Sequence, residues 1–296
     1  MSSLVSICIP TFNGEQFIAD AIESALSQTY QNIEIIVSDD CSFDDTLKII
    51  ESYKSKTSIP ILIFKHTPKG IGANWNNCIK HSNGEHIKFL FQDDVLKPSC
   101  IEEMVKVINS DDKISLVACK REFIISNYSN AQINLWIENF KDLQSDLILS
   151  KPNLYLLDKT FLKSEMFLRS PLNKVGEPTA TLFRTSIVNK VGFFNEKLKQ
   201  DLDFEFYYRI LKHHQIAIIN KPLVNFRIHP NQATNVNRTT SVNDKSLFYS
   251  ILLKDFFWYL NFKYQKKLFL NKTILGKVLN KSYHKLINIF DKSKII

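Results

Sequence analysis

The chain has 296 residues, 44% of them hydrophobic and 23% charged, which is the composition of a globular protein with a buried core. No run of 18 apolar residues predicts a membrane-spanning helix, and the opening MSSLVSICIPTFNGE is not typical of a secretory signal. The whole net charge of +8 comes from residues 241–296, which contain 11 lysines and 3 aspartates. The first 240 residues carry equal numbers of basic and acidic residues, which argues against a broad nucleic-acid-binding surface. Five scattered cysteines argue against structural zinc or disulfides, and we expect a cytoplasmic protein.

Short apolar runs alternate with helically spaced segments over the first 120 residues. Strands are expected at 5–10, 33–40, 59–66, 86–91 and 114–119, and helices at 15–28, 44–53, 74–81 and from about Pro98. This alternation predicts a parallel sheet with right-handed crossovers, and unbroken apolar runs are typical of strands covered on both faces.

The second half is less regular. Residues 120–172 hold aromatic and apolar clusters without a clear period, so we expect helices and loops there. A loop, short strand and helix are expected over 176–196, a helix over 201–214, and a strand followed by a loop over 217–230.

Polar side chains follow three of the predicted strands where those strands end. Thr11 to Asn13 follow the first, Asp39-Asp40 the second and Asp93-Asp94 the fourth. Ligands of parallel sheets bind at the carboxyl ends of strands, and Mg²⁺ or Mn²⁺ bound to a diphosphate uses one or two carboxylates. The alternative for Asp93-Asp94 is a cap on the helix near Pro98.

Other classes of nucleotide-binding protein have characteristic motifs, and the sequence can be searched for them. PTFNGE after the first strand lacks the G-x-G-x-x-G of dinucleotide-binding folds, and no G-x-x-x-x-G-K-[ST] loop occurs. A nucleotidyltransferase would be expected to carry a glycine-rich basic loop at the first strand end, and this loop has no basic residue.

Four stretches resemble the inverting family 2 glycosyltransferases, which have the GT-A fold. VSICIPTFNGEQFIADAIESALSQTYQNIEIIVSDDCSFDDT resembles the opening block, GEHIKFLFQDDVLKP the block with the DXD motif, GEPTATLFRTSIVNKVGFFNEKLKQDLDFEFYYRI the acceptor-side block, and VNFRIHPNQAT the closing one. The resemblance covers roughly residues 4–235. It implies an α/β GT-A domain, a Rossmann-like and mainly parallel sheet with helices on both faces, over residues 1–238. Its nucleotide-binding half would be about 1–120 and its acceptor half about 121–238, and a basic helical tail would follow over 239–296.

The resemblance also implies roles for residues on the donor side. The nucleotide would lie beside Pro10, Thr11, Asn13, Glu15, Asp39, Asn76 and Asp93. Asp39 would accept from the imide N–H of uracil or thymine, with a cap on the following loop as the alternative. Asp94 would ligate Mn²⁺ or Mg²⁺, and His229 would reach the metal or diphosphate or serve a structural role. Gln92 occupies the position of the first acid of the DXD motif. Trp75 occupies a position where many family members have an arginine, and it would serve either as a packing residue or as a stacking platform.

An inverting transferase needs a base that deprotonates the acceptor hydroxyl. In the family pattern this base precedes an arginine by six residues, and counting back from Arg209 gives Asp203, with Asp201 as the runner-up. Glu177 and Arg209 are expected on the acceptor side. The alternative for Asp201 and Glu205 is a solvated helix surface.

The tail has two interpretations. An apolar stripe is formed by Tyr249, Leu252, Leu253, Phe256, Phe257 and Leu260, and a basic ridge by Lys277, Lys281 and Lys285. The tail is either a helix pair packed on the catalytic domain or a peripheral surface that binds anionic lipid.

Together these features predict a metal-dependent transferase that moves a sugar from a UDP- or dTDP-sugar to a saccharide or lipid-linked acceptor in surface polysaccharide biosynthesis. The alternatives are a non-catalytic sugar-nucleotide-binding protein and, less favoured, a sugar nucleotidyltransferase.

Overall fold

A computed structural model of the chain describes residues 2–125, 131–230, 232, 244–273 and 275–278. The strands are β1 (Val5–Thr11), β2 (Ile33–Asp39), β3 (Ile61–Lys65), β4 (His86–Phe89), β5 (Val95–Leu96), β6 (Ile114–Ile125), β7 (Leu154–Leu157), β8 (Thr181–Arg184) and β9 (Gln215–Ile228). The helices are α1 (Ile18–Leu26), α2 (Thr46–Lys54), α3 (Ile71–His81), α4 (Cys100–Ile108), α5 (Ala131–Phe140), α6 (Lys159–Lys163), α7 (Ile187–Val191), α8 (Leu202–Leu211), α10 (Lys245–Ile251) and α11 (Phe262–Lys272), with short helical turns η1 (Pro178–Ala180), η2 (Leu252–Phe256) and η3 (Phe257–Tyr259).

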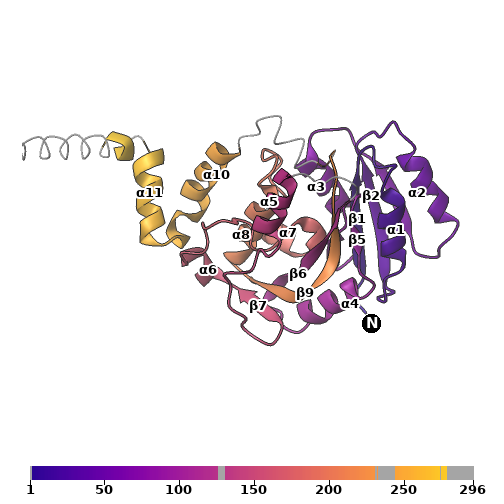
Figure 1. Cartoon of the computed structure of the whole chain (residues 1–296), viewed down its shortest axis with the longest axis horizontal. Coiled ribbons are helices and arrows are strands. Elements are labelled where there is room, and N and C mark those ends of the chain that lie inside the picture. The colour runs from indigo at the N-terminus through magenta and orange to yellow at the C-terminus, as the bar shows by residue number, and fades with distance from the viewer. Residues whose placement is uncertain (1, 126–130, 231, 233–243, 274, 279–296) are drawn as a thin grey trace, which may run out of the picture.

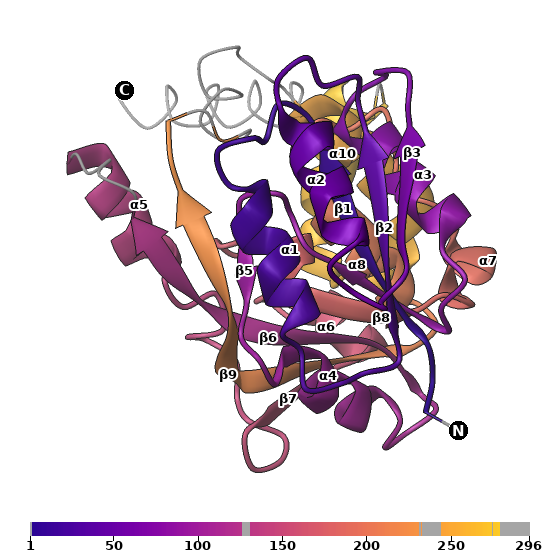
Figure 2. The same cartoon turned by 90° about the vertical axis from the view of Figure 1, so that its right-hand side faces the viewer.

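One nine-stranded sheet runs through the molecule in the order β3-β2-β1-β4-β8-β6-β9-β5, with β7 added beside β9 (Figures 1 and 2). The strands β3, β2, β1 and β4 are parallel, as the alternation of strands and helices predicted. Every residue of β1 and β2 is buried, which is why their sequences are mainly apolar and do not alternate between apolar and polar residues along their whole length. Thr11 pairs with Asp39, and Asp39 with Lys65, so the polar ends of three strands meet at one edge.

The other half of the sheet is mixed. β8 lies antiparallel between β4 and β6, while the two longest strands, β6 and β9, run parallel to each other. The expectation of loops and helices directly after residue 119 was wrong, because β6 continues to Ile125. Its register with β9 shifts between Cys119 and Arg121, and this irregularity hides the period in the sequence.

The two faces of the sheet carry separate hydrophobic cores. Helices α1 and α4 cover one face through residues such as Ile22 and Met104. The other face is covered by α3, α8 and the first part of the predicted tail, which share one core. None of the helices in the described segments combines the length and apolar character needed to span a bilayer.

The described part of the tail packs on the domain. Its buried side chains are Phe248, Ile251, Leu252, Phe256, Leu260 and Leu268. The Phe248 ring lies 5.2 Å from the ring of Phe204 on α8, so α10 extends the hydrophobic core around α8. Lys281 and Lys285 of the predicted ridge lie outside the described residues, as does the expected boundary at 238/239, which stays a prediction.

Candidate active site

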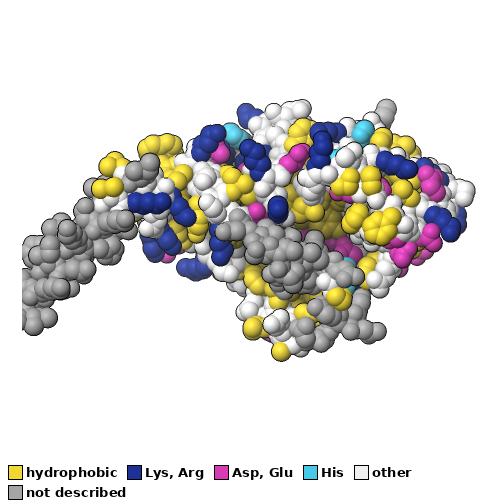
Figure 3. Space-filling view, turned by 90° about the horizontal axis from the view of Figure 1, so that it is seen from above, with side chains coloured by type: hydrophobic (Ala, Val, Ile, Leu, Met, Phe, Trp, Pro, Cys, Tyr) yellow, Lys and Arg dark blue, Asp and Glu magenta, His cyan; other side chains and the backbone are white. Residues whose placement is uncertain are grey.

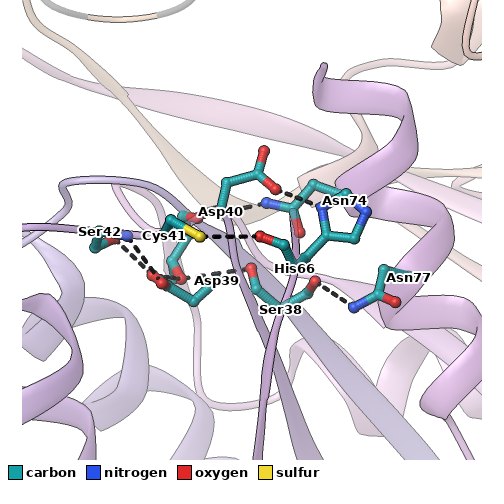
Figure 4. A network of polar contacts seen from close by, with 9 residues as sticks. Ser38, Asp39, Asp40, Cys41, Ser42, His66, Asn74 and Asn77 are labelled. Atoms are coloured by element: carbon teal, nitrogen blue, oxygen red, sulfur yellow. Dashed lines mark hydrogen bonds and ion pairs between the residues drawn. The ribbon is translucent and has the colours of Figure 1, made fainter. Parts of the chain in front are cut away.

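The ends of β1 and β2 are joined by a buried hydrogen-bond network. The Thr11 hydroxyl donates to Oδ1 of Asp39 at 3.1 Å, and the backbone N–H of Ser42 donates to Oδ2 at 2.9 Å. The Ser42 hydroxyl also donates to Oδ1 (Figure 4). Asp39 is fully buried, and three of its roughly four acceptor positions are used. It therefore caps the following loop, which was the alternative role, and one acceptor position remains for a ligand.

Asn13 and Glu15 connect the loop after β1 with the loop after β2. Asn13 has a φ of +47°, which asparagine tolerates, and its Oδ1 accepts from the backbone N–H of Phe43 at 3.1 Å. Glu15 accepts from the backbone N–H of Asp45 at 2.9 Å. Pro10 lies in β1 beneath them. The expected nucleotide-binding residues of this region thus form one preorganised wall.

A second pair at the strand ends was missed from the sequence. Nδ1 of His66 lies 2.5 Å from Oδ1 of Asp40, and the His66 carbonyl accepts from the Cys41 thiol at 3.4 Å (Figure 4). Burial raises the pKa of Asp40, while its contact with His66 opposes that shift. The available signal was register: Asp39 pairs with Lys65, so the next residues along β2 and β3 emerge together.

The structure corrects the assignment of Asn76 to the nucleotide. Its Nδ2 donates to the Phe194 carbonyl at 3.0 Å and to Glu196 at 2.9 Å, and its Oδ1 accepts from the Phe194 N–H at 2.9 Å. All of these contacts tie α3 to the loop after α7. Asn74, by contrast, points to the strand ends, where its Nδ2 donates weakly to the Thr11 carbonyl at 3.4 Å (Figure 4).

Trp75 is a packing residue. It is buried against the rings of Phe89, Phe91 and Phe194, with centroid distances between 5.1 and 6.0 Å. Of the two roles open to it, packing is the one that the structure gives.

Gln92 bridges two strand-end loops. Its Oε1 accepts from the Phe12 N–H at 2.9 Å, and its Nε2 donates to the Phe12 carbonyl at 3.1 Å. An aspartate at this position could accept the first bond but could not donate the second. Gln92 therefore fixes the loop after β1 against the loop that holds the acid pair.

The adjacent acids Asp93 and Asp94 have different environments. Oδ2 of Asp93 lies 2.9 Å from Nε2 of His229, and both side chains are partly exposed. The Asp93 carbonyl accepts from Nε of Arg227 at 2.8 Å. Both side chains of the pair Asp93 and His229 therefore remain partly accessible to solvent.

Asp94, expected to hold the metal, is only 1% exposed, and its Oδ1 accepts from the backbone N–H of Arg227 at 2.9 Å. Its Oδ2 has no hydrogen-bond partner within the described residues. Burial and the neighbouring Asp93 raise the pKa of Asp94 well above its usual range. Asp94 is closed to solvent whereas the Asp93 side chain is partly exposed, so Asp93 is the more accessible of the two to a metal ion.

Asp203 lies at the start of α8 and is held by an ordered loop. Nδ2 of Asn173 donates to its Oδ2 at 2.8 Å. The same Asn173 fixes its own loop, since Oδ1 accepts from the N–H groups of Val175 and Gly176 at 3.0 and 2.9 Å. Burial raises the pKa of Asp203 to about 8, and the charges of Glu177 and Asp201 add to the shift. Sequence reasoning missed Asn173, because its pairing with Asp203 arises only in the folded chain.

Asp201, the runner-up base, lies beside an acid from the tail. Burial and the charge of Asp244 raise the pKa of Asp201 to about 6. Oδ2 of Asp244 accepts from the N–H groups of Lys199, Gln200 and Asp201 at 2.8, 2.7 and 3.1 Å. The backbone that leads into α8 is thus anchored by a residue 43 positions downstream of Asp201.

Glu177 connects the two groups of acids. It forms an ion pair with Arg121 at 2.8 Å, and its charge raises the pKa of both Asp94 and Asp203. The Thr179 hydroxyl lowers the pKa of Asp94, although it is too poorly aligned for a good hydrogen bond. Acidic side chains also gather in the middle of the face seen in Figure 3. The structure thus brings Asp93, Asp94, Glu177 and Asp203 to one region.

Arg209 does not belong to this group. Its guanidinium binds Glu205 through Nε and Nη2 at 2.9 and 3.0 Å, and it also donates to the Val191 and Phe193 carbonyls. Six residues along an α-helix turn the side chain by about 240° relative to Asp203, so the two lie on different faces of α8. Glu205 is 3% exposed, which corrects the idea that it is solvated surface.

Replacing Arg209 by alanine is therefore expected to destabilise the fold by about 3–5 kcal/mol, because it leaves the Glu205 carboxylate buried without its partner. Urea unfolding measures this loss. The matched control is Glu205→Gln with Arg209→Met, which removes both charges and should cost much less. Equal costs for the two variants would contradict the ion-pair explanation.

The chemistry of the donor atoms indicates whether this site could bind a metal ion. Oxygen and imidazole ligands suit Mn²⁺, and carboxylates suit Mg²⁺. No group of three His, Cys, Asp or Glu side chains in the described segments could hold an ion. Asp93 and His229 would then supply two ligands, and the diphosphate and water the others, which is the usual arrangement for these ions at substrate phosphates.

The architecture matches solved structures of GT-A glycosyltransferases. The structure of Staphylococcus aureus TarS 1–349 in complex with UDP aligns with a TM-score of 0.61 at 19% identity, covering 90% of this chain and 69% of that one. At this identity the likeness defines the fold, a GT-A fold with additional C-terminal helices.

Sequence comparison then gives the family. The profile of Glycosyl transferase family 2 matches residues 6–192. An uncharacterised glycosyltransferase of Rickettsia typhi is 32% identical over 238 residues, or 79% of this chain and 67% of that protein. Chondroitin synthase of Escherichia coli is 27% identical over 227 residues, or 76% of this chain and 29% of that protein. The chain belongs to glycosyl transferase family 2.

Proposed function

We propose that the protein transfers a sugar from a UDP- or dTDP-sugar to a hydroxyl of a saccharide or lipid-linked acceptor, with inversion, in surface polysaccharide biosynthesis. The observation that carries this proposal is Asp203, a partly exposed acid with a pKa of about 8, oriented by Asn173. A binding protein has no need of an oriented acid on the acceptor side.

The nucleoside part of the donor would lie along the wall formed by Thr11, Asn13 and Asp39. Asp39 retains one acceptor position, which suits the imide N–H of uracil or thymine. TarS, which shares the fold, was solved in complex with UDP, and this supports a pyrimidine donor here. The diphosphate would then reach Asp93 and His229.

In the proposed reaction the Asp203 carboxylate takes the proton of the acceptor hydroxyl. The hydroxyl oxygen bonds to the anomeric carbon as the bond from that carbon to the diphosphate breaks, so the configuration inverts in one displacement. Mn²⁺ or Mg²⁺ on Asp93 and His229 would stabilise the negative charge of the departing diphosphate. Asn173 donates to Oδ2 of Asp203 and the backbone N–H of Phe204 donates to Oδ1 at 2.8 Å, so both oxygens of the carboxyl group are held in a fixed orientation.

A cytoplasmic location at the inner face of the membrane is part of the proposal, supported by five free cysteines.

The proposal is tested with a panel of UDP-, dTDP- and GDP-sugars in the presence of Mn²⁺. Thermal shift identifies the donor, and release of its nucleoside diphosphate with a saccharide acceptor measures transfer. We expect stabilisation by a pyrimidine donor and acceptor-dependent release. Donor binding without release from any acceptor, in wild type and Asp203→Asn alike, would favour the non-catalytic binding protein instead.

A further inference from the structure

The outer side of the C-terminal helices carries large apolar side chains that project into solvent. Trp258 in η3 is 82% exposed and Phe262, at the start of α11, is 78% exposed. Leu252, Phe256 and Leu260 of the apolar stripe are buried in the core, whereas these two side chains are not part of it. Helix α11 lies at the end of the molecule far from β1 and β2 (Figure 1).

The segment that contains Trp258 and Phe262 is basic. Residues 256–278 contain five lysines and no acidic residue. Lys263, Lys266 and Lys267 share one face of α11 with Phe262, opposite the inward-facing Leu268, because a helix turns by about 100° per residue. Lys263 has one distant carboxylate, Glu165 at 3.8 Å, and both side chains are largely exposed. Hydrophobic and basic side chains also lie side by side on this arm in Figure 3.

We propose that this surface, formed by Trp258, Phe262, Lys263, Lys266 and Lys267, docks the protein on an anionic lipid bilayer. Tryptophan and phenylalanine insert at the boundary between head groups and acyl chains, and lysines beside them attract anionic lipid. A basic surface with protruding aromatic rings, whose own segment 256–278 contains no acidic residue, is complementary to such a membrane. The inference deepens the proposed function, since docking would bring the site to a lipid-linked acceptor.

The structure also separates this surface from the donor site. Its residues belong to η3 and α11, whereas the strand-end residues belong to the loops after β1, β2 and β4. Docking can therefore be measured without donor or acceptor. A failed transfer assay would count against the proposed function alone, and failed docking against this inference alone.

The test is co-sedimentation of the full chain with phosphatidylcholine vesicles, with and without phosphatidylglycerol, at low and high salt. Wild type is expected to bind only the anionic vesicles, and more weakly in high salt. Lys263→Gln with Lys266→Gln and Lys267→Gln should weaken binding on the order of 100-fold. The matched control removes three exposed lysines elsewhere, Lys48→Gln, Lys69→Gln and Lys106→Gln, and should bind nearly as wild type.

Insertion is tested separately with Trp258. Brominated lipid is expected to quench the fluorescence of wild type, and Trp258→Phe should remove that quenching although Trp75 and Trp136 remain. Several outcomes would overturn the inference: no vesicle binding, equal binding to neutral vesicles, or equal loss in the control variant. A concentration-dependent dimer that Trp258→Ala abolishes would assign the surface to a second copy of the chain instead.

Discussion

Asp203→Asn is expected to lower the transfer rate by about 10²–10⁴-fold while donor affinity hardly changes. The substitution keeps the shape of the side chain and removes the basic oxygen, and this loss corresponds to roughly 3–5 kcal/mol of barrier. Donor affinity should persist because Asp203 lies at the start of α8, apart from the strand-end wall. Steady-state transfer and calorimetric donor binding, measured on the same preparations, check both parts.

The matched control is Asp201→Asn, two residues away. The Asn173 amide donates to Asp203 and not to Asp201, whose pKa is raised by burial and by the charge of Asp244, so the loss in Asp201→Asn should be much milder. An inactive Asp201→Asn beside an active Asp203→Asn would shift the assignment by two residues.

The same acid predicts a pH dependence. Because the pKa of Asp203 is raised to about 8, the free protein holds the acid protonated at neutral pH, and the base form appears as pH rises. We expect kcat/KM to increase up to about pH 8 and then level off, and Asp203→Asn to lose this rise. Stability has the opposite sign: a raised pKa favours folding at low pH, and this contribution is lost between about pH 4 and 8. A profile unchanged by Asp203→Asn would exclude Asp203 as the titrating group.

Divalent metal is expected to strengthen binding of UDP or dTDP, and Asp93→Asn should abolish most of that coupling. The Asp93 carboxylate is partly exposed and meets His229 at 2.9 Å, so a cation and its diphosphate can reach it. Calorimetry with Mn²⁺ and with EDTA measures the coupling, and His229→Ala should reduce it as well.

Asp94→Asn provides the comparison within the pair. An amide resembles the protonated acid that burial favours, so this variant should keep its metal coupling. If Asp94→Asn loses the coupling and Asp93→Asn retains it, the assignment made from sequence was right. Equal nucleotide affinity with and without EDTA in wild type would remove the metal from the proposal.

The parallel half of the fold was predictable because each strand at its centre has both faces buried. The mainly apolar sequences of β1 and β2 are a consequence of that burial. In the mixed half, the strands expected at 114–119, within 176–196 and over 217–230 are confirmed as β6, β8 and β9, but their antiparallel and parallel pairing was not predicted, because β6 and β9 are bulged and pair with partners distant in sequence. Helix α8 lies within the predicted 201–214.

The site was only partly predictable, and for a related reason. Residue type at the strand ends predicted Thr11, Asp39 and Asp93 as site residues. It did not predict which polar side chains form hydrogen bonds within the protein instead of binding a ligand. Asn76 is polar and close to Asn74 in the helix, yet its amide is fully bonded to the loop after α7. The difference between Asp93 and Asp94 depends on which one β9 covers, through the Arg227 N–H. Such contacts are set by packing rather than by sequence spacing.

The carboxylate of Asp244 has a consequence for protein engineering. It receives three backbone amides directly before α8, and Phe248 behind it packs on Phe204. Helix α8 and the residues that anchor it therefore belong to two stretches of chain. A cut after residue 238 would separate these stretches. A chimera that exchanges acceptor preference between family members has to carry residues 244–268 together with α8. If only the block around α8 were transplanted, the backbone N–H groups of residues 199–201 before the helix would lose the Asp244 carboxylate that accepts their hydrogen bonds.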